Sequence, residues 1–424
     1  MADSGSPRRP AATLVVVGAS EILTCCRDAI DKVGRISAGV VAIIGERVFA
    51  VGPESAVATC CDLDSARRID ANGGVVLPGF VDCHTHLVFA GSRVDEYCGR
   101  LAGLGTKDMV ARGIPAGIAA TVARMASASD EQLIRSACER LSYMLSFGTT
   151  TVESKSGYGL STELEMRMLR INQSLKSLQP VDIVSTFLGA HDFPSSKSHA
   201  AYIDEIINES IPAVAEAELA EFNDVYCDEG YYTVSESRRI LETGLKHGLK
   251  PKIHTDAYSN IGGSRIAAEI PVVSADHLNY TDDVETVALR DAGVVGVVMP
   301  GLEFAVGHPR PCRARRMLDT GLELALATDL CPACWLESMP FAVQMACLFY
   351  KFSPAEALRA ATYVAAKSLK REGDIGSIEP GKRADIAIFD IPSHEDLAYR
   401  LGRGRARIVI KSGVVVFEDR LGRT

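Results

Sequence analysis

The stretch Leu77-Pro78-Gly79-Phe80-Val81-Asp82-Cys83-His84-Thr85-His86 decides the fold of this 424-residue chain. It includes most of an apolar run, Val75–His84, which is predicted to be a strand and which leads into two histidines separated by one residue. Residues i and i+2 of a strand point to the same side, so the two imidazoles converge on one point. Such a pair is typical of a metal site, although the motif alone also arises by chance.

Seven further predicted strands follow this stretch and alternate with helices. Several are near-continuous apolar runs, which are typical of parallel strands covered on both faces. Eightfold alternation of strand and helix favours an α/β fold with a closed (β/α)8 barrel, the TIM barrel; an open doubly wound sheet is the alternative. The seven strands are predicted at Thr149–Lys155, Ile183–His191, Asp224–Asp228, Pro251–Asp256, Val272–Leu278, Val294–Pro300 and Leu324–Asp329.

The helices between the strands carry their own start signals. Ser353, Pro354 and Glu356 predict a capped start with a proline in the first turn. Thr162 and Glu165 predict a capping box, in which each side chain satisfies a free amide at the helix start.

The two ends of the chain do not follow the alternation. Residues 1–12 are predicted to be a mobile tail, and residues 13–74 and 378–424 both show short strands joined by turns. We expect these two segments to form one small β-sandwich domain. The barrel is then expected to occupy residues 75–377.

Composition excludes several classes of protein. Hydrophobic residues make up 47% and charged residues 23%, which is ordinary for a folded domain. The net charge of −9 offers no attraction to nucleic acid or an anionic membrane, and no apolar run is long enough to span a bilayer. The 12 cysteines lack the spacing of a small secreted disulfide scaffold. We therefore expect a cytoplasmic protein whose partner is a small molecule.

Residues that commonly bind metals recur at the ends of the predicted barrel strands. His191, His254, His277 and Asp329 end the third, fifth, sixth and eighth strands, at the end of the barrel where active sites are built. Imidazole and carboxylate groups are good ligands for zinc or iron. Core histidines would not be expected to gather in this way. The pattern predicts one metal ion held by His84, His86, His254 and Asp329.

The other residues near this point predict the remaining chemistry. A bound ion lowers the pKa of its water toward neutrality. Asp329 is predicted to be both ligand and proton acceptor, and His277 to hydrogen-bond a substrate oxygen or the water. The fourth strand ends in Cys227, Asp228 and Glu229 without a lysine that could bridge two metals, which favours one ion over two.

Two segments, Leu77–His86 and Gly376–Asp385, resemble the amidohydrolase superfamily. Ala90–Glu96, Glu153–Leu160 and Gly189–His191 resemble the members of that superfamily that open an imidazolone ring. The resemblance implies a hydrolase of cyclic-amide C–N bonds that uses one zinc or iron ion on the four ligands named above. Its implied reaction converts 4-imidazolone-5-propanoate to N-formimidoyl-L-glutamate in histidine degradation.

The resemblance also implies the substrate contacts. Arg93 would hold the propanoate carboxylate with its planar fork of donors, and Tyr158 and His191 would bond the polar edge of the ring. From the residues alone, Arg93 is also compatible with a salt bridge to Asp95 or Glu96, and Tyr158 with loop packing. Barrels of this superfamily are often dimers, so the resemblance is compatible with a homodimer.

Two positions depart from the superfamily pattern. A glutamate is common three residues after the fifth-strand histidine, where this chain has Ala257. That glutamate is the proton shuttle of related deaminases, so its absence argues against deamination and removes a presumed substrate contact. After Asp329 the family usually carries Asn, Pro, Gly and a small hydroxyl residue, whereas this chain has Leu330, Cys331, Pro332, Ala333 and Cys334. The side-chain contact expected at Cys331 is thereby in question, whereas backbone contacts at Ala333 are compatible with this sequence.

The pair Cys331 and Cys334 forms a single C-x-x-C motif, which alone is a weak signal for zinc or redox chemistry. We expect it to be a loop of small residues that borders the pocket. The departures leave two alternatives. One is a related mononuclear hydrolase of a different cyclic amide or amidine, and the other is a catalytically silent barrel with a structural or regulatory role.

Overall fold

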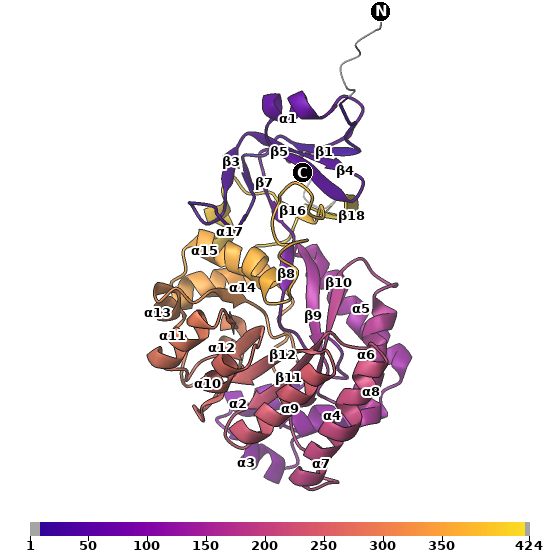
Figure 1. Cartoon of the computed structure of the whole chain (residues 1–424), viewed down its shortest axis with the longest axis vertical. Helices are drawn as coiled ribbons and strands as arrows, with labels where there is room; N and C mark the ends of the chain where they lie inside the picture. The colour runs from indigo at the N-terminus through magenta and orange to yellow at the C-terminus, as the bar shows by residue number, and fades with distance from the viewer. Residues whose placement is uncertain (1–8, 420–424) are drawn as a thin grey trace, which may run out of the picture.

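The protein is a (β/α)8 barrel with a small β-sandwich at one end, as the computed structural model shows for residues 9–419 (Figure 1). Eight parallel strands lie side by side in sequence order from β8 to β15. This order confirms the predicted barrel and argues against the doubly wound alternative. The barrel strands are β8 (Phe80–Asp82), β9 (Thr149–Lys155), β10 (Asp182–Ala190), β11 (Phe222–Cys227), β12 (Lys250–Thr255), β13 (Ser274–His277), β14 (Val295–Val298) and β15 (Leu324–Leu326).

The first and last barrel strands meet just beyond their ends. Thr85 and Leu330 form a parallel bridge, and the amide of Asp329 donates to the carbonyl of His84 at 3.1 Å. One layer below, Asp82 accepts hydrogen bonds from the amide and the hydroxyl of Thr328 at 3.1 and 2.5 Å. These bonds bring the residues that follow β8 against those that follow β15.

The apolar run predicted as one strand, Val75–His84, is two strands in the structure. β7 (Val75–Pro78) belongs to the sandwich and β8 to the barrel, and Gly79 lies between them. A Cβ at Gly79 would lie 2.3 Å from the side chain of Thr150, so only glycine lets the chain pass there. Both parts are buried, which is why their hydrophobicity gives no sign of the break.

Both ends of the chain build the sandwich, as the sequence predicts. One sheet has the strand order β5-β4-β1-β6 and the other β18-β17-β16-β7-β2-β3. Val41 and Ile43 of the first sheet share a buried cluster with Ile386 and Ile410 of the second. Residues 1–8 of the predicted tail lie outside the described range. The sandwich strands are β1 (Leu14–Val17), β2 (Glu21–Leu23), β3 (Arg35–Ser37), β4 (Gly39–Ile44), β5 (Arg47–Pro53), β6 (Arg67–Asp70), β7, β16 (Ile386–Phe389), β17 (Ile408–Lys411) and β18 (Val414–Glu418).

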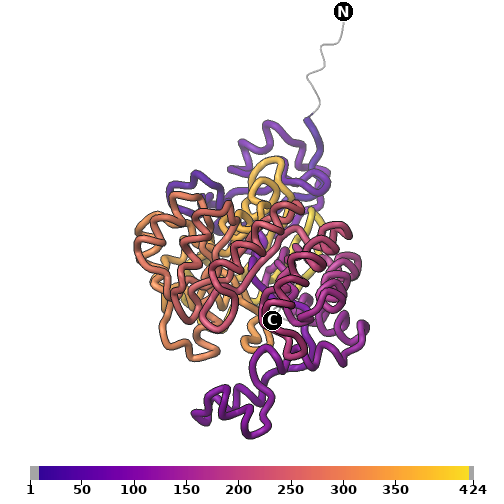
Figure 2. Tube along the Cα trace, turned by 60° about the horizontal axis from the view of Figure 1, so that its bottom comes forward, coloured from indigo at the N-terminus to yellow at the C-terminus, as the bar shows by residue number. Residues whose placement is uncertain are grey.

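Helices cover the outside of the barrel. Helices α2 and α3 lie at the end away from the sandwich and project beyond it (Figures 1 and 2). Among the described residues, no helix has both the length and the apolar character needed to cross a membrane. The helices are α1 (Glu54–Cys60), α2 (Val94–Leu101), α3 (Thr106–Ala111), α4 (Gly117–Ser127), α5 (Asp130–Ser146), α6 (Thr162–Leu175), α7 (His199–Glu205), α8 (Ile211–Glu216), α9 (Val234–Lys246), α10 (Gly263–Glu269), α11 (Asp283–Asp291), α12 (Pro300–Val306), α13 (Ala314–Asp319), α14 (Met339–Met345), α15 (Pro354–Arg359), α16 (Ala365–Lys367) and α17 (His394–Tyr399), with π-helical turns at Ile206–Ser210, Ala346–Tyr350 and Ala360–Val364.

Of the two predicted capped helix starts, the structure confirms one and contradicts the other. The capping box of Ser353 and Glu356 is present at the start of α15, which confirms that prediction. The box predicted for Thr162 and Glu165 is wrong. Ser161 caps α6 instead, because the carboxylate of Glu165 turns back into the preceding loop and bonds its amides.

We expect Gly79→Ala to destabilise the protein by about 1–3 kcal/mol, because the new methyl group overpacks the junction at Thr150. Urea unfolding followed by circular dichroism measures the change. The control is Gly373→Ala, where no atom lies within 4 Å of the added Cβ. Equal unfolding midpoints for the two variants would contradict the steric argument.

Candidate metal centre and active site

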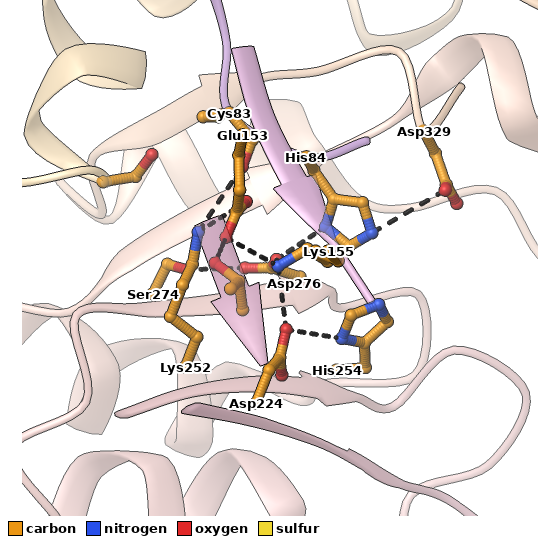
Figure 3. Close-up of polar contacts among 12 residues, drawn as sticks. Cys83, His84, Glu153, Lys155, Asp224, Lys252, His254, Ser274, Asp276 and Asp329 are labelled. Atoms are coloured by element: carbon orange, nitrogen blue, oxygen red, sulfur yellow. Dashed lines mark hydrogen bonds and ion pairs between the residues drawn. The ribbon is translucent and has the colours of Figure 1, made fainter. Parts of the chain in front are cut away.

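Five side chains that the sequence singles out converge at the carboxyl ends of the barrel strands, and Figure 3 shows three of them, His84, His254 and Asp329. His84 and His86 follow β8, His254 lies on β12, His277 ends β13 and Asp329 follows β15. Nε2 of His84 and Nε2 of His86 each lie 3.7 Å from Oδ1 of Asp329. The ring centroids of His84 and His254 are 4.5 Å apart, and those of His254 and His277 are 5.2 Å apart.

The donor atoms of this centre fit a metal ion. Two groups that share His84 have ligand atoms within 4.8 Å of one another: His84 with His86 and Asp329, and His84 with His254 and His277. Nε2 of His84, Nε2 of His254 and Oδ1 of Asp329 are buried without a hydrogen-bond partner in residues 9–419. Buried polar atoms normally have partners, so atoms left free and aimed together indicate a binding site for a cation.

Two buried carboxylates orient two of the imidazoles. Asp276 Oδ2 lies 2.6 Å from Nδ1 of His84, and Asp224 Oδ2 lies 3.1 Å from Nδ1 of His254 (Figure 3). The contact of His84 is a hydrogen bond to a carboxylate, so its Nδ1 carries the proton and its Nε2 presents a lone pair to the centre. His84 therefore holds the tautomer that a metal ligand needs, and Asp224 keeps the ring of His254 beside it at ion-pair distance.

The charge states of the centre also suit a cation. Burial is the main cause that lowers the pKa values of His84, His86 and His277 below the ordinary range, which keeps these rings neutral. Burial raises the pKa of the Asp329 carboxyl, although the charge of Lys155 opposes this effect. A cation beside Asp329 would favour its ionised form.

The backbone is held in an unusual conformation at two of these positions. His277 has φ of 83° and Asp329 has φ of 50°. Positive φ is uncommon outside glycine and occurs where the surroundings fix the chain. His277 ends β13 and Asp329 lies three residues beyond the end of β15, so these turns aim their side chains across the end of the barrel.

Two of the predicted substrate residues form a wall beside the centre. The ring of His191 stacks on that of His86 with centroids 4.9 Å apart and planes 14° apart. Tyr158 lies 5.4 Å from both rings, and all three side chains are buried. Burial lowers the pKa of His191 to about 3, so its ring is neutral at physiological pH.

The loop that carries Tyr158 is held by the carboxylate of Glu165. This buried group accepts hydrogen bonds from the amides of Gly157, Gly159 and Leu160 at 2.7, 2.7 and 2.9 Å. Loop amides otherwise require water or a strand partner. Glu165 therefore fixes the loop and, with it, the ring of Tyr158.

Arg93 forms the salt bridge with Glu96 that the sequence offered as an alternative, within a partly buried cluster of ions. Its Nε lies 3.0 Å from Glu96 Oε2, and its side chain is 10% exposed. Glu96 also accepts from Arg100 at 2.8 Å and from the amide of Gly117 at 2.8 Å. Two cations share one carboxylate, so a positive charge remains. The charge of Arg93 lowers the pKa values of Tyr158 and Asp329, against the larger effect of burial, which places it near both groups.

The two departures from the superfamily pattern lie in the same region. Ala257 is buried, and its carbonyl lies 2.9 Å from Nε2 of His308. Asp256 does not take the place of the missing glutamate, because Thr255, Ser264 and Thr281 hydroxyls occupy its carboxylate. The neighbouring Tyr258 is 51% exposed and stands beside the ring of His308.

Cys331 and Cys334 face each other across a tight turn. Each amide donates to the carbonyl of the other, at 3.0 and 3.1 Å, and both thiols are buried and free. Ala333 is half-buried in the turn between them. Burial raises the pKa of the Cys331 thiol to about 12, which makes it a poor nucleophile. The pair is a compact loop beside Asp329, as the sequence leads us to expect.

Sequence reasoning missed the charged residues beneath the imidazoles: Glu153, Lys155, Asp224, Lys252 and Asp276. The sequence does contain a signal for them, because these charged residues interrupt predicted strands whose other residues are mostly apolar. A charged side chain inside a barrel strand must find a partner of opposite charge. Period-2 spacing also places Lys252 and His254 on the same face of β12.

Comparison with known proteins identifies the family. The amidohydrolase family profile matches residues 75–416, and the chain belongs to that family. The imidazolonepropionase of Geobacillus kaustophilus is 42% identical over 416 residues, which cover 97% of both chains. That of Haloarcula marismortui is 40% identical over 95% of both chains. Within the amidohydrolases, this chain therefore belongs with the imidazolonepropionases.

Solved structures show the same fold at low identity. An adenosine deaminase from Xanthomonas campestris with bound zinc is 18% identical, with a TM-score of 0.74 over 97% of this chain and 94% of that one. An atrazine chlorohydrolase from Arthrobacter aurescens in complex with zinc is 16% identical, with a TM-score of 0.71 over 96% and 95%. These similarities confirm the fold and say nothing of the substrate.

We expect Glu165→Gln to destabilise the loop of Tyr158 by about 1–3 kcal/mol, because one amide donor then faces another donor. Hydrogen exchange at Gly157 to Leu160 should become faster, which mass spectrometry detects. Glu163→Gln, two residues earlier in α6, is the control. Unchanged protection of the loop in Glu165→Gln would refute the assigned role.

Proposed function

We propose that this chain hydrolyses 4-imidazolone-5-propanoate to N-formimidoyl-L-glutamate, a ring-opening step of histidine degradation. We further propose that it uses one zinc or iron ion held by His84, His86, His254 and Asp329. The observation that carries the proposal is the convergence of free, correctly oriented donor atoms in a chain that belongs with the imidazolonepropionases.

When bound, a divalent ion supplies a Lewis acid that activates water and polarises a carbonyl group. Arg93 receives the propanoate carboxylate, and Glu96 keeps its guanidinium in place. Tyr158 and His191 bond the polar edge of the ring and, with His86, exclude solvent from one side. The substrate is thus fixed with its ring carbonyl toward the donor cluster.

The protons are carried by residues of this chain. Asp329 accepts a proton from the attacking water, for which its buried carboxylate is well suited. His277, neutral because burial lowers its pKa, donates a hydrogen bond to the oxygen that gains negative charge. Asp329 then returns the proton to the ring nitrogen while the bond between that nitrogen and the carbonyl carbon breaks. The net change is the addition of one water molecule.

A second candidate function is hydrolysis of a different cyclic amide or amidine. It is favoured by Ala257 and Cys331, since no side chain described above replaces the missing glutamate. A panel of imidazolones, hydantoins and lactams separates the two candidates, because only the first predicts preference for the propanoate-bearing imidazolone. A silent barrel is disfavoured by the complete donor set.

Location and assembly are also proposals. All 12 cysteines are free thiols, which supports a reducing compartment such as the cytoplasm. A homodimer follows from the superfamily resemblance alone, and light scattering on the purified protein tests it. The net charge of −9 supports neither a nucleic-acid nor a membrane partner.

We expect purified enzyme to abolish the absorbance of 4-imidazolone-5-propanoate. His254→Ala and Asp329→Ala should each reduce kcat/KM by more than about 100-fold, since losing a ligand costs more than losing a ligand's partner. Elemental analysis should find one ion per wild-type chain and less in the variants. Chelator-treated protein should regain turnover with either Zn²⁺ or Fe²⁺, and the better ion identifies the metal. Full turnover in either variant would remove the metal proposal.

We expect Arg93→Met to raise KM for the imidazolone propanoate by about 10- to 100-fold, because a charge-assisted hydrogen bond is lost. Steady-state kinetics measures the effect. The control is an imidazolone with a methyl group in place of the propanoate, for which wild type and variant should be equally poor. An equal rise in KM for both substrates would show that Arg93 does not bind the propanoate carboxylate.

A further inference from the structure

A group of buried ions lies beneath the imidazoles and takes no part in the mechanism above. Glu153, Lys155, Asp224, Lys252 and Asp276 each have side chains that are 0% exposed. They come from β9 and from three consecutive strands, β11, β12 and β13, and Figure 3 shows how their side chains lie together. Removing five charges from water costs free energy unless each charge is paired. We therefore expect this buried ion group to have a function.

Lys155 is the centre of the buried ion group. Its ammonium nitrogen lies 2.8 Å from Asp224 Oδ2, 3.1 Å from Glu153 Oε1 and 3.4 Å from Asp276 Oδ2. The ammonium donates hydrogen bonds to Glu153 and Asp224 and forms an ion pair with Asp276, so it contacts carboxylates on three strands. The lysine thereby ties β9, β11 and β13 together at one depth in the barrel.

The same carboxylate oxygens also face the imidazoles. Oδ2 of Asp276 contacts both Lys155 and Nδ1 of His84, and Oδ2 of Asp224 contacts both Lys155 and Nδ1 of His254. Lys155 therefore acts on two histidines from different strands, each through one shared oxygen. Without its charge, Asp224 and Asp276 would repel each other and lose their common anchor.

We propose that Lys155 is the positioning residue of the metal centre. It sets the separation and the ring orientation of His84 and His254 by holding the two carboxylates that contact them. The inference rests on the proposed function only in that these histidines are taken as ligands.

The chain offers a matched control in Lys252. This lysine is equally buried and shares Glu153, with its nitrogen 2.8 Å from Oε2. Its other hydrogen bond goes to the carbonyl of Cys83 at 3.4 Å rather than to Asp224 or Asp276. Loss of either lysine removes one cation from the buried ion group, but only Lys155 contacts the oxygens that orient the imidazoles.

The test compares full-length wild type, Lys155→Met and Lys252→Met after metal removal. Zn²⁺ affinity is measured by competition with a chelating dye, and ligand geometry by the visible absorption of the Co²⁺-loaded protein. We expect Lys155→Met to bind Zn²⁺ about 10- to 100-fold more weakly and to change the Co²⁺ spectrum. Lys252→Met should keep wild-type affinity and spectrum, while both variants lose thermal stability as apoproteins.

Wild-type affinity in Lys155→Met, or an equal loss in both variants, would overturn the role of Lys155 and leave the proposed function standing. Wild-type protein that binds neither Zn²⁺ nor Co²⁺ would overturn the metal centre and this inference together. Should Lys155→Met fail to fold, Asp276→Asn takes its place. That variant keeps the shape of the side chain but removes its charge, and unchanged Zn²⁺ affinity in it would also refute the proposal.

Discussion

The meeting of the first and last barrel strands is the constraint on which the site depends. His84 and His86 follow β8 and Asp329 follows β15, so these donors become neighbours only when the barrel closes. The closing contacts are the Thr85–Leu330 bridge and the hydrogen bonds of Asp82 with Thr328. Because they lie beside and directly beneath the donors, the fold and the metal centre share the same few bonds.

The buried polar groups of this barrel form a connected series, in which each group holds the next in position. Glu153 pairs with Lys252, Lys155 pairs with Asp224 and Asp276, and these two aspartates contact His84 and His254. A charged interior costs more desolvation free energy than an apolar one, since every buried charge needs a partner of opposite charge. In return, the imidazoles are held by carboxylates that are themselves paired with Lys155.

Much of the fold and of the site could be predicted from the sequence, and the failures have physical causes. Strand ends carrying His84, His254 and Asp329 are visible because ligand residues stand out against apolar runs. The break at Gly79 is not visible, since the residues on both sides are buried alike. Glu165 satisfies the spacing of a capping box, but the amides of its own loop compete successfully for the carboxylate. The pairing of Lys155 depends on which strands are neighbours, which hydrophobic periodicity does not report.

The passage of the chain from β7 into β8 has a consequence for biosynthesis. β7 pairs with β16, whose residues Ile386–Phe389 leave the ribosome long after His84 and His86 have emerged. Until then β7 has only the short parallel contact with β2, so the strand that leads into the first two histidines lacks its main neighbour. Capture of the ion is therefore expected to be a late, post-translational event that follows docking of the last strands.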